Sequence, residues 1–149
     1  DNALGLAGGE SVISSMQSLD ELLGRIEDAT AAPDLVIVTD IVQVFEHMPS
    51  GESTRLKLLI RDAKPGMRPA WVLASEAWCL SGIYEDWYRV VTSHAAGLWV
   101  GSGFADQTLF RYPRALAAHR EPLGFCDGFL VQHDDIRAVR LLEPEGDAE

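Results

Sequence analysis

Hydroxyl and carboxyl side chains follow each of two short apolar runs in this sequence. Thr39 and Asp40 come directly after Leu35-Val36-Ile37-Val38, and a second run, Ala70 to Ser75, is followed by Glu76. If the two runs are neighbouring parallel strands, these side chains face one crevice, because ligands gather at the carboxyl ends of strands in open α/β sheets. A carboxylate there can hold Mg²⁺, directly or through water, or can orient an attacking water. The alternative is that Asp40 simply caps the helix that follows it.

A nucleotide-hydrolysing site also needs a loop that holds phosphates, and this sequence does not encode one. No G-x-x-x-x-G-K-[ST] segment occurs in the 149 residues. The backbone N–H groups and the lysine with which that loop binds phosphates are therefore missing. Glu76 adds a negative charge that repels a γ-phosphate unless a metal or an arginine compensates it. We expect that the chain does not hydrolyse a nucleotide unaided.

A basic window between the two runs contains a candidate arginine finger. Its five basic residues are Arg55, Lys57, Arg61, Lys64 and Arg68. Arg61 lies in this window and could reach the nucleotide of a neighbouring subunit. The alternative is a solvated helix face opposite Leu56, Leu59 and Ile60. Elsewhere, His133-Asp134-Asp135 could ligate a metal or form a polar hairpin turn. The four tryptophans are expected in a core or an interface rather than in a stacking platform for bases.

Strands and helices alternate along the chain. Apolar spacing predicts helices at about 19–29, 52–63 and 84–93, and residues 41–47 are either helical or extended. Buried strands are predicted at 35–38 and 70–75 and shorter strands at 11–15 and 98–100, whereas residues 1–10 are predicted as a loop. Alternating residues in 127–132 and 136–141 predict a hairpin. This order predicts an α/β fold with a mainly parallel central sheet, helices on both faces and a C-terminal β-hairpin.

Length and composition bound the class of protein. Residues 1–142 have the length of a single α/β domain, and residues 143–149 are expected to form an acidic flexible tail. With a net charge of −11, a surface that tracks DNA is not expected. No apolar run approaches the ~20 residues of a membrane span, so direct membrane insertion is not expected. Cys79 and Cys126 lie in apolar company and are expected to be buried reduced thiols of a cytoplasmic protein.

Together these pieces resemble the core of the FtsK/SpoIIIE branch of RecA-like motor ATPases, which includes the translocases of type VII secretion systems. Val36 to Phe45 resembles the Walker B strand and the segment after it, residues 52–64 the following helix, and Trp71 to Glu76 the sensor strand. Residues 87–91 and 97–100 resemble the late helix and strand, and 106–113 the loop near the C-terminus. Residues 128–142 resemble the closing β-structure of the type VII members. The resemblance covers roughly residues 11–142, as a pattern of elements more than of identities.

The resemblance implies a nucleotide-binding fold that takes ATP and Mg²⁺ only with an upstream phosphate-binding loop. It implies that Asp40 is the metal-side or water-positioning acid and that Thr39 and Ser75 contact the nucleotide. Glu76 would belong to the sensor region, and Arg61 would be a finger that acts on a neighbouring subunit. The implied partners are other domains or subunits of a ring-forming translocase, in the cytoplasm or on the cytosolic side of a membrane-anchored machine. The acidic balance favours a secreted protein over DNA as the substrate.

The sequence departs from the family at the end of the first apolar run. The family has Asp followed by Asp or Glu there, and this chain has Thr39-Asp40-Ile41. Asp40 is therefore either the second, water-orienting acid with the metal-side acid lost, or the first acid with Ile41 in place of the second. Two explanations follow. The chain is part of a larger ATPase domain with its phosphate loop upstream, or it is a degenerate module kept for docking or regulation.

The second explanation leads to a different class of function, a non-catalytic protein-interaction module. Such a module is expected to carry an apolar partner surface around Trp78, Tyr84, Trp87 and Tyr88. A small flavodoxin-like enzyme is a third option, for which Gln17-Ser18 is too slight a cofactor loop.

Overall fold

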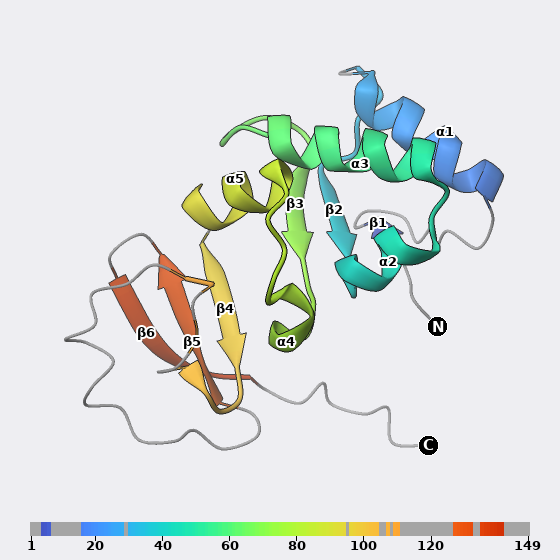
Figure 1. Ribbon diagram of the computed structural model, residues 1–149. Coiled ribbons are helices and arrows are strands. Elements are labelled where there is room, and N and C mark those ends of the chain that lie inside the picture. The colour runs from blue at the N-terminus through green and yellow to red at the C-terminus, as the bar shows by residue number, and fades with distance from the viewer. Residues whose placement is uncertain are drawn as a thin grey trace, which may run out of the picture. The chain divides into compact units, whose positions relative to one another are not determined.

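A computed structural model (Figure 1) describes residues 4–6, 16–28, 30–94, 96–104, 107, 109–110, 127–132 and 135–141. The chain divides into two compact units, Asp1–Val90 and Val91–Glu149. The single domain predicted over residues 1–142 stays a prediction. The strand predicted at 11–15, most of the loop-like segment at 106–113, Cys126, His133-Asp134 and the acidic tail lie outside the described residues.

The first unit contains a three-stranded sheet in the order β1-β2-β3 (Leu4–Leu6, Leu35–Val38, Ala70–Leu73). β2 pairs with β3 in parallel, from Leu35 opposite Ala70 to Val38 opposite Leu73, as predicted for the two apolar runs. β1 pairs with β2 in antiparallel fashion. The prediction of a loop over residues 1–10 is therefore wrong at Leu4–Leu6, where a three-residue strand is too short to leave a periodic pattern.

The α/β class is confirmed in a coarser form than predicted. Among the strand pairs of the described residues, only the β2–β3 pair is parallel. β2 buries Val36 and Val38 completely, as predicted. β3 is not a buried strand, because Ala70 is exposed and Val72 is 48% exposed. Its run of apolar residues did not distinguish a covered strand from one with an exposed face.

Helices in the first unit supply most of its core. α1 (Met16–Glu27) and α3 (Ser50–Asp62) pack against each other and lie side by side in Figure 1. α2 (Ile41–His47) follows β2, α4 (Ala77–Leu80) follows β3, and α5 (Asp86–His94) leads into the second unit. The predicted helices at 19–29, 52–63 and 84–93 are thus confirmed within a few residues, and α4 was not predicted. The core side chains are Leu19, Leu22, Leu23, Ile26, Val36, Val38, Ile41, Leu56, Ile60 and Trp87.

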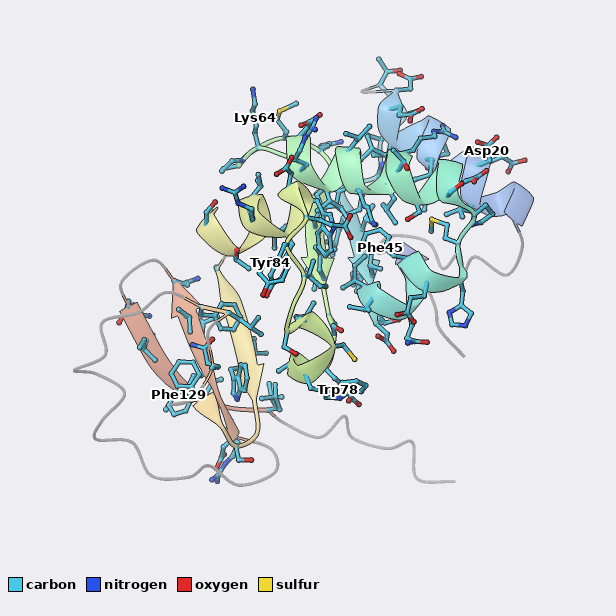
Figure 2. All side chains as sticks on the ribbon, viewed as in Figure 1. Asp20, Phe45, Lys64, Trp78, Tyr84 and Phe129 are labelled. Carbon is cyan, nitrogen blue, oxygen red and sulfur yellow. The ribbon has the colours of Figure 1, made fainter. Side chains whose placement is uncertain are left out.

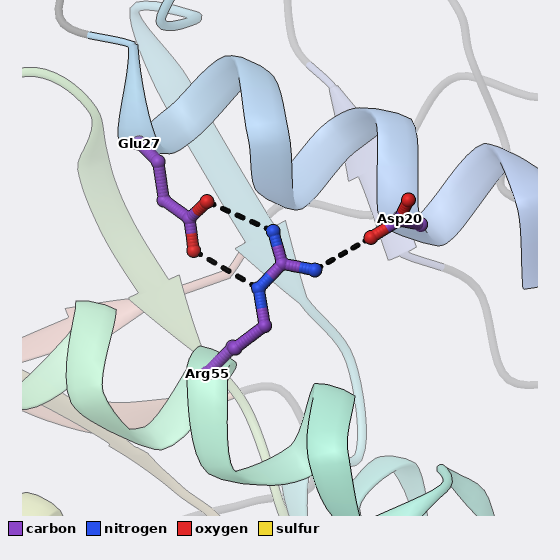
Figure 3. A network of polar contacts seen from close by, with 3 residues as sticks. All are labelled: Asp20, Glu27 and Arg55. Carbon is purple, nitrogen blue, oxygen red and sulfur yellow. Dashed lines mark hydrogen bonds and ion pairs between the residues drawn. The ribbon is translucent and has the colours of Figure 1, made fainter.

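Arg55 joins α1 to α3 on the surface through an ion-pair network (Figure 3). Its Nε and Nη2 donate to the two carboxylate oxygens of Glu27 at 3.0 and 2.8 Å, and its Nη1 donates to Asp20 Oδ1 at 2.5 Å. The two-pronged contact with Glu27 uses the planar fork of the guanidinium, which is the strongest geometry for such a pair. One positive charge on α3 therefore neutralises two carboxylates that lie about two turns apart on α1.

The second unit is a three-stranded antiparallel sheet in the order β4-β5-β6 (Gly97–Val100, Asp127–Gln132, Asp135–Arg140). β5 and β6 form the predicted hairpin, with Gln132 opposite Asp135. One face packs against Phe104, and the cluster is completed by Phe129, Val131 and Ile136 with Trp99 and Phe110 at its margin. None of the helices in the described ranges is long and apolar enough to span a membrane.

Candidate functional site

The parallel pairing of β2 and β3 brings the predicted site residues to one edge of the sheet. The pairing continues past the strand ends, where the Ala74 N–H donates to the Val38 carbonyl at 2.9 Å and the Ile41 N–H donates to the Ala74 carbonyl at 3.0 Å. Asp40 and Ser75 therefore lie on adjacent segments at the carboxyl ends of the strands. α2 and α4 begin at this same edge (Figure 1). We call it the carboxyl edge.

Asp40 has an unusual backbone conformation. Its φ of 52° and ψ of 58° lie in the left-handed region, and it is the single non-glycine residue of the described chain with a positive φ. The left-handed conformation costs an L-residue about 1–2 kcal/mol, although Asp and Asn tolerate it better than most. Asp40 occupies the N-cap position of α2, but its side chain makes no capping hydrogen bond. Capping by the side chain therefore does not account for the carboxylate.

Two oxygens at the carboxyl edge are buried without a hydrogen-bond partner. They are Asp40 Oδ1 and Ser75 Oγ. Unsatisfied buried polar atoms are uncommon, and each costs about 1–3 kcal/mol. The carboxyl edge therefore combines backbone strain with polar groups that the fold itself does not satisfy. Strained backbone clusters at functional sites, and a buried polar atom without a partner in the chain is open to a water, an ion or a ligand.

The other predicted site residues have separate surroundings. Glu76 precedes α4 and accepts a hydrogen bond from the Trp78 indole N–H. Thr39 is exposed between β2 and Asp40. Arg61 lies near the end of α3, which leads to the start of β3, so it is at the opposite end of the strands from Asp40 (Figure 1). Its Nε donates to Asp62 Oδ1 at 2.7 Å. The structure thus brings together Asp40, Ser75 and Glu76, and it does not bring Arg61 to them.

Sequence reasoning missed two members of the carboxyl edge, Glu46 and Cys79. Cys79 is a half-buried free thiol on α4. Partial burial raises the pKa of this thiol, and the carboxylates of Asp40, Glu76 and Glu46 raise it further. Three negative charges from α2, α4 and the end of β2 therefore act on one point. The signal in the sequence was Glu46, an acid in the predicted 41–47 segment. It becomes informative only once that segment is known to be a helix that starts directly after Asp40.

The described residues contain no group of three His, Cys, Asp or Glu side chains placed to hold a metal. Asp40 alone still suits Mg²⁺, which is commonly bound by one or two carboxylates together with waters and phosphate oxygens. At the predicted alternative site near the hairpin turn, Asp135 pairs with Arg137 at 2.7 Å.

Aromatic side chains of the first unit divide into a buried set and an exposed set. Trp87 is 3% exposed and meets Phe45 edge to face, with ring centroids 5.0 Å apart. Trp78 and Tyr84 are 72% and 87% exposed (Figure 2). The predicted partner surface around Trp78, Tyr84, Trp87 and Tyr88 is therefore wrong for Trp87, a core residue. The spacing of aromatics in the sequence did not reveal which of them face inward.

Lys57 connects the buried aromatic set to its surroundings. Its ammonium lies 4.9 Å from the centroid of the Phe45 ring and pairs with a Glu85 carboxylate oxygen at 2.7 Å. A residue of the predicted basic window thus has a structural role, packing α3 against α2 and the segment before α5.

No protein-family model matches the chain, and comparisons with curated proteins and with solved structures return no match. Function is therefore inferred from the geometry of the carboxyl edge and from the exposed side chains of Trp78 and Tyr84.

Proposed function

We propose that this chain is part of an FtsK/SpoIIIE-like ring translocase ATPase domain and that it is not catalytic by itself. The observation that carries the proposal is the parallel β2–β3 pair, with the buried oxygens of Asp40 and Ser75 at its carboxyl edge. In a RecA-like reading, β2 is the Walker B strand and β3 the sensor strand. The protein would act in the cytoplasm, beside other domains or subunits of the ring. Its acidic charge favours a protein over DNA as the polymer that is moved.

In this function each residue of the carboxyl edge has a distinct task. Asp40 would hold Mg²⁺, directly or through water, or orient the attacking water. When bound, Mg²⁺ neutralises charge on the phosphate oxygens of ATP. Ser75 would donate its hydroxyl proton to a phosphate oxygen or the water, and Thr39 would contact the nucleotide. Arg61, held at the other end of the strands, could act only on a nucleotide bound elsewhere, as a finger acting on a neighbouring subunit would.

The phosphates themselves need a binding loop from outside this sequence. Glu46 and Glu76 add negative charge near Asp40, so a triphosphate at the carboxyl edge would be repelled without backbone N–H groups, a lysine or a metal to offset them. The isolated chain is therefore expected to show neither ATP binding nor ATP hydrolysis.

The test compares this chain with a longer version that includes any residues its gene encodes ahead of Asp1. ATP binding is measured by calorimetry and hydrolysis by phosphate release. We expect both activities only in the longer version, and we expect Asp40→Asn to reduce hydrolysis there by about 10²-fold or more. Asp34→Asn is the matched control, because Asp34 adjoins the other end of β2 and pairs with Arg68. A longer version without ATP affinity, or an unchanged rate in Asp40→Asn, contradicts the proposal.

The exposure of Trp78 and Tyr84 favours a second candidate function, that of a protein-interaction module with a degenerate nucleotide-binding fold. Large aromatic side chains at high exposure contribute nothing to a core and are enriched in binding hot spots. This function predicts no nucleotide affinity in any version of the chain. Because Trp87 is buried, a Trp87→Ala variant would lose structure as well as any partner, so Trp78→Ala and Tyr84→Ala are the informative variants.

A further inference from the structure

Trp78 projects into solvent from α4 at the carboxyl edge (Figure 2). The side chain is 72% exposed on α4, and its indole N–H donates to the Glu76 carboxylate, two residues earlier. That hydrogen bond restrains the ring, so less conformational entropy is lost when a partner packs on it. Tryptophan is among the residue types most enriched where binding energy concentrates.

The carboxylates beside Trp78 lack basic partners. In the described chain, no lysine or arginine forms an ion pair with Asp40, Glu46 or Glu76. Glu46 instead accepts from the Gln43 side-chain amide at 2.9 Å. All three carboxylates lie close enough to Cys79, the residue after Trp78, to act on its thiol. The carboxyl edge therefore presents an exposed indole in contact with Glu76, with Glu46 also exposed and Asp40 partly buried beside them.

We propose that this surface, formed by Trp78, Asp40, Glu46 and Glu76, docks an arginine-bearing segment of a partner protein. We call it the indole–carboxylate surface. A guanidinium is planar, so it stacks on an indole while its N–H groups donate to carboxylates. A lysine ammonium satisfies the charge but stacks poorly, and phosphates of a nucleic acid are repelled. The proposal rests on the second candidate function and gives its partner a chemical identity.

Charge complementarity favours a different protein over a second copy of this chain. Six of the seven arginines in the described residues, all except Arg25, already form ion pairs within the chain. Apart from Arg25, each of these arginines in a second copy would have to leave its pair to offer a guanidinium, and a second copy would bring a further net charge of −11. A partner with an unpaired arginine has neither cost.

The experiment titrates the intact chain with a capped (Arg-Gly)₃ peptide, with (Lys-Gly)₃ as the comparison, and no nucleotide is present. Binding is measured by calorimetry and by the NMR signals of the indole N–H groups. We expect Trp78→Ala to weaken (Arg-Gly)₃ binding by about tenfold and to leave the weaker (Lys-Gly)₃ binding unchanged. Met67→Ala, which removes an exposed apolar side chain from the segment before β3, at the other end of the strands, should leave both affinities unchanged.

Two variants, each of which removes one carboxylate, separate specific docking from a general attraction to the negative charge of the chain. Glu46→Gln should weaken (Arg-Gly)₃ binding about threefold, whereas Glu21→Gln, an exposed acid on α1, should not. Three results overturn the proposal: no binding at millimolar peptide, an affinity in Trp78→Ala within twofold of the parent, or equal losses in Glu46→Gln and Glu21→Gln. Because ATP takes no part, these results are independent of the outcome for the ATPase proposal.

Discussion

Two acidic regions of the first unit differ in whether their carboxylates have a basic partner. On the α1–α3 surface, Asp20 and Glu27 converge on one guanidinium, that of Arg55 (Figure 3). At the carboxyl edge, Asp40, Glu46 and Glu76 have no basic partner in the described chain, and two oxygens there are buried without a hydrogen bond. The first region is complete as it stands. The second leaves charge and hydrogen-bonding capacity for another molecule, which is why we place function there.

The largest expected effect concerns the two tryptophans, one in the core and one at the carboxyl edge. Trp87→Ala should lower the free energy of unfolding by about 3–5 kcal/mol, because it empties a packed aromatic site. Trp78→Ala should change it by no more than about 0.5 kcal/mol, because the ring is mostly in solvent. Urea denaturation followed by circular dichroism gives both values. Similar losses in the two variants would mean that Trp78 supports the fold, and the contrast between the regions would weaken.

A substitution that relieves the backbone strain at Asp40 should make the chain more stable. Asp40→Gly is expected to raise the free energy of unfolding by about 1 kcal/mol, since glycine adopts a positive φ without a steric cost and the buried carboxylate is removed. Asp40→Val should lower it, because a β-branched residue suits the left-handed region poorly. The same urea denaturation measures both changes. A less stable Asp40→Gly variant would indicate that the carboxylate stabilises the fold through a contact of its own.

On the α1–α3 surface, the ion pair between Arg55 and Glu27 should make the stability of the chain depend on pH. Hydrogen bonds from Arg55 lower the pKa of Glu27 below its ordinary value of 4.5. A carboxyl whose pKa is lower in the folded state adds stability above its unfolded pKa, and that stability is lost as the pH falls through the folded pKa. Arg55→Gln should therefore be less stable than the parent at pH 7, with the difference shrinking below about pH 4.5. Urea midpoints from pH 7 to pH 3 test this, and a difference independent of pH would contradict it.

The smallest expected effect is on the reactivity of the Cys79 thiol, which reports on the unpaired carboxylates at the carboxyl edge. Burial and the carboxylates of Asp40, Glu76 and Glu46 raise the pKa of this thiol above its ordinary value of 9.0. Glu46→Gln should lower that pKa and speed alkylation by iodoacetamide at pH 8 a few-fold, since the thiolate is the nucleophile. A Cys126→Ser background leaves Cys79 as the sole thiol. Glu21→Gln is the control, and an equal acceleration there would assign the effect to net charge.

Much of the first unit could be predicted from the sequence where a run was long or strongly patterned. β2 was predicted at residues 35–38 because four apolar residues stand between Asp34 and Thr39, and α1 and α3 followed from helical spacing. The meeting of Asp40 and Ser75 followed from the rule that parallel strands share their carboxyl ends.

The remainder depended on tertiary context. β1 and α4 are too short for a periodic signal. The burial of Trp87 and the exposure of Trp78 depend on which side of a short element packs. The local sequence suggests the reverse, because the exposed Trp78 has apolar neighbours whereas the buried Trp87 follows Asp86 and lies two residues before Arg89. The positive φ of Asp40 and the unsatisfied oxygens are properties of the folded backbone, so no residue pattern indicates them.

The second unit carries a feature by which distant relatives can be recognised. Gly128 faces the main chain of β4 so closely that a Cβ atom there would collide with the Trp99 carbonyl oxygen. Every other amino acid adds that atom, so a protein that keeps this strand pair in the same position is expected to keep glycine at the corresponding place. An alignment of future candidates can be judged on this one column before any of them is crystallised.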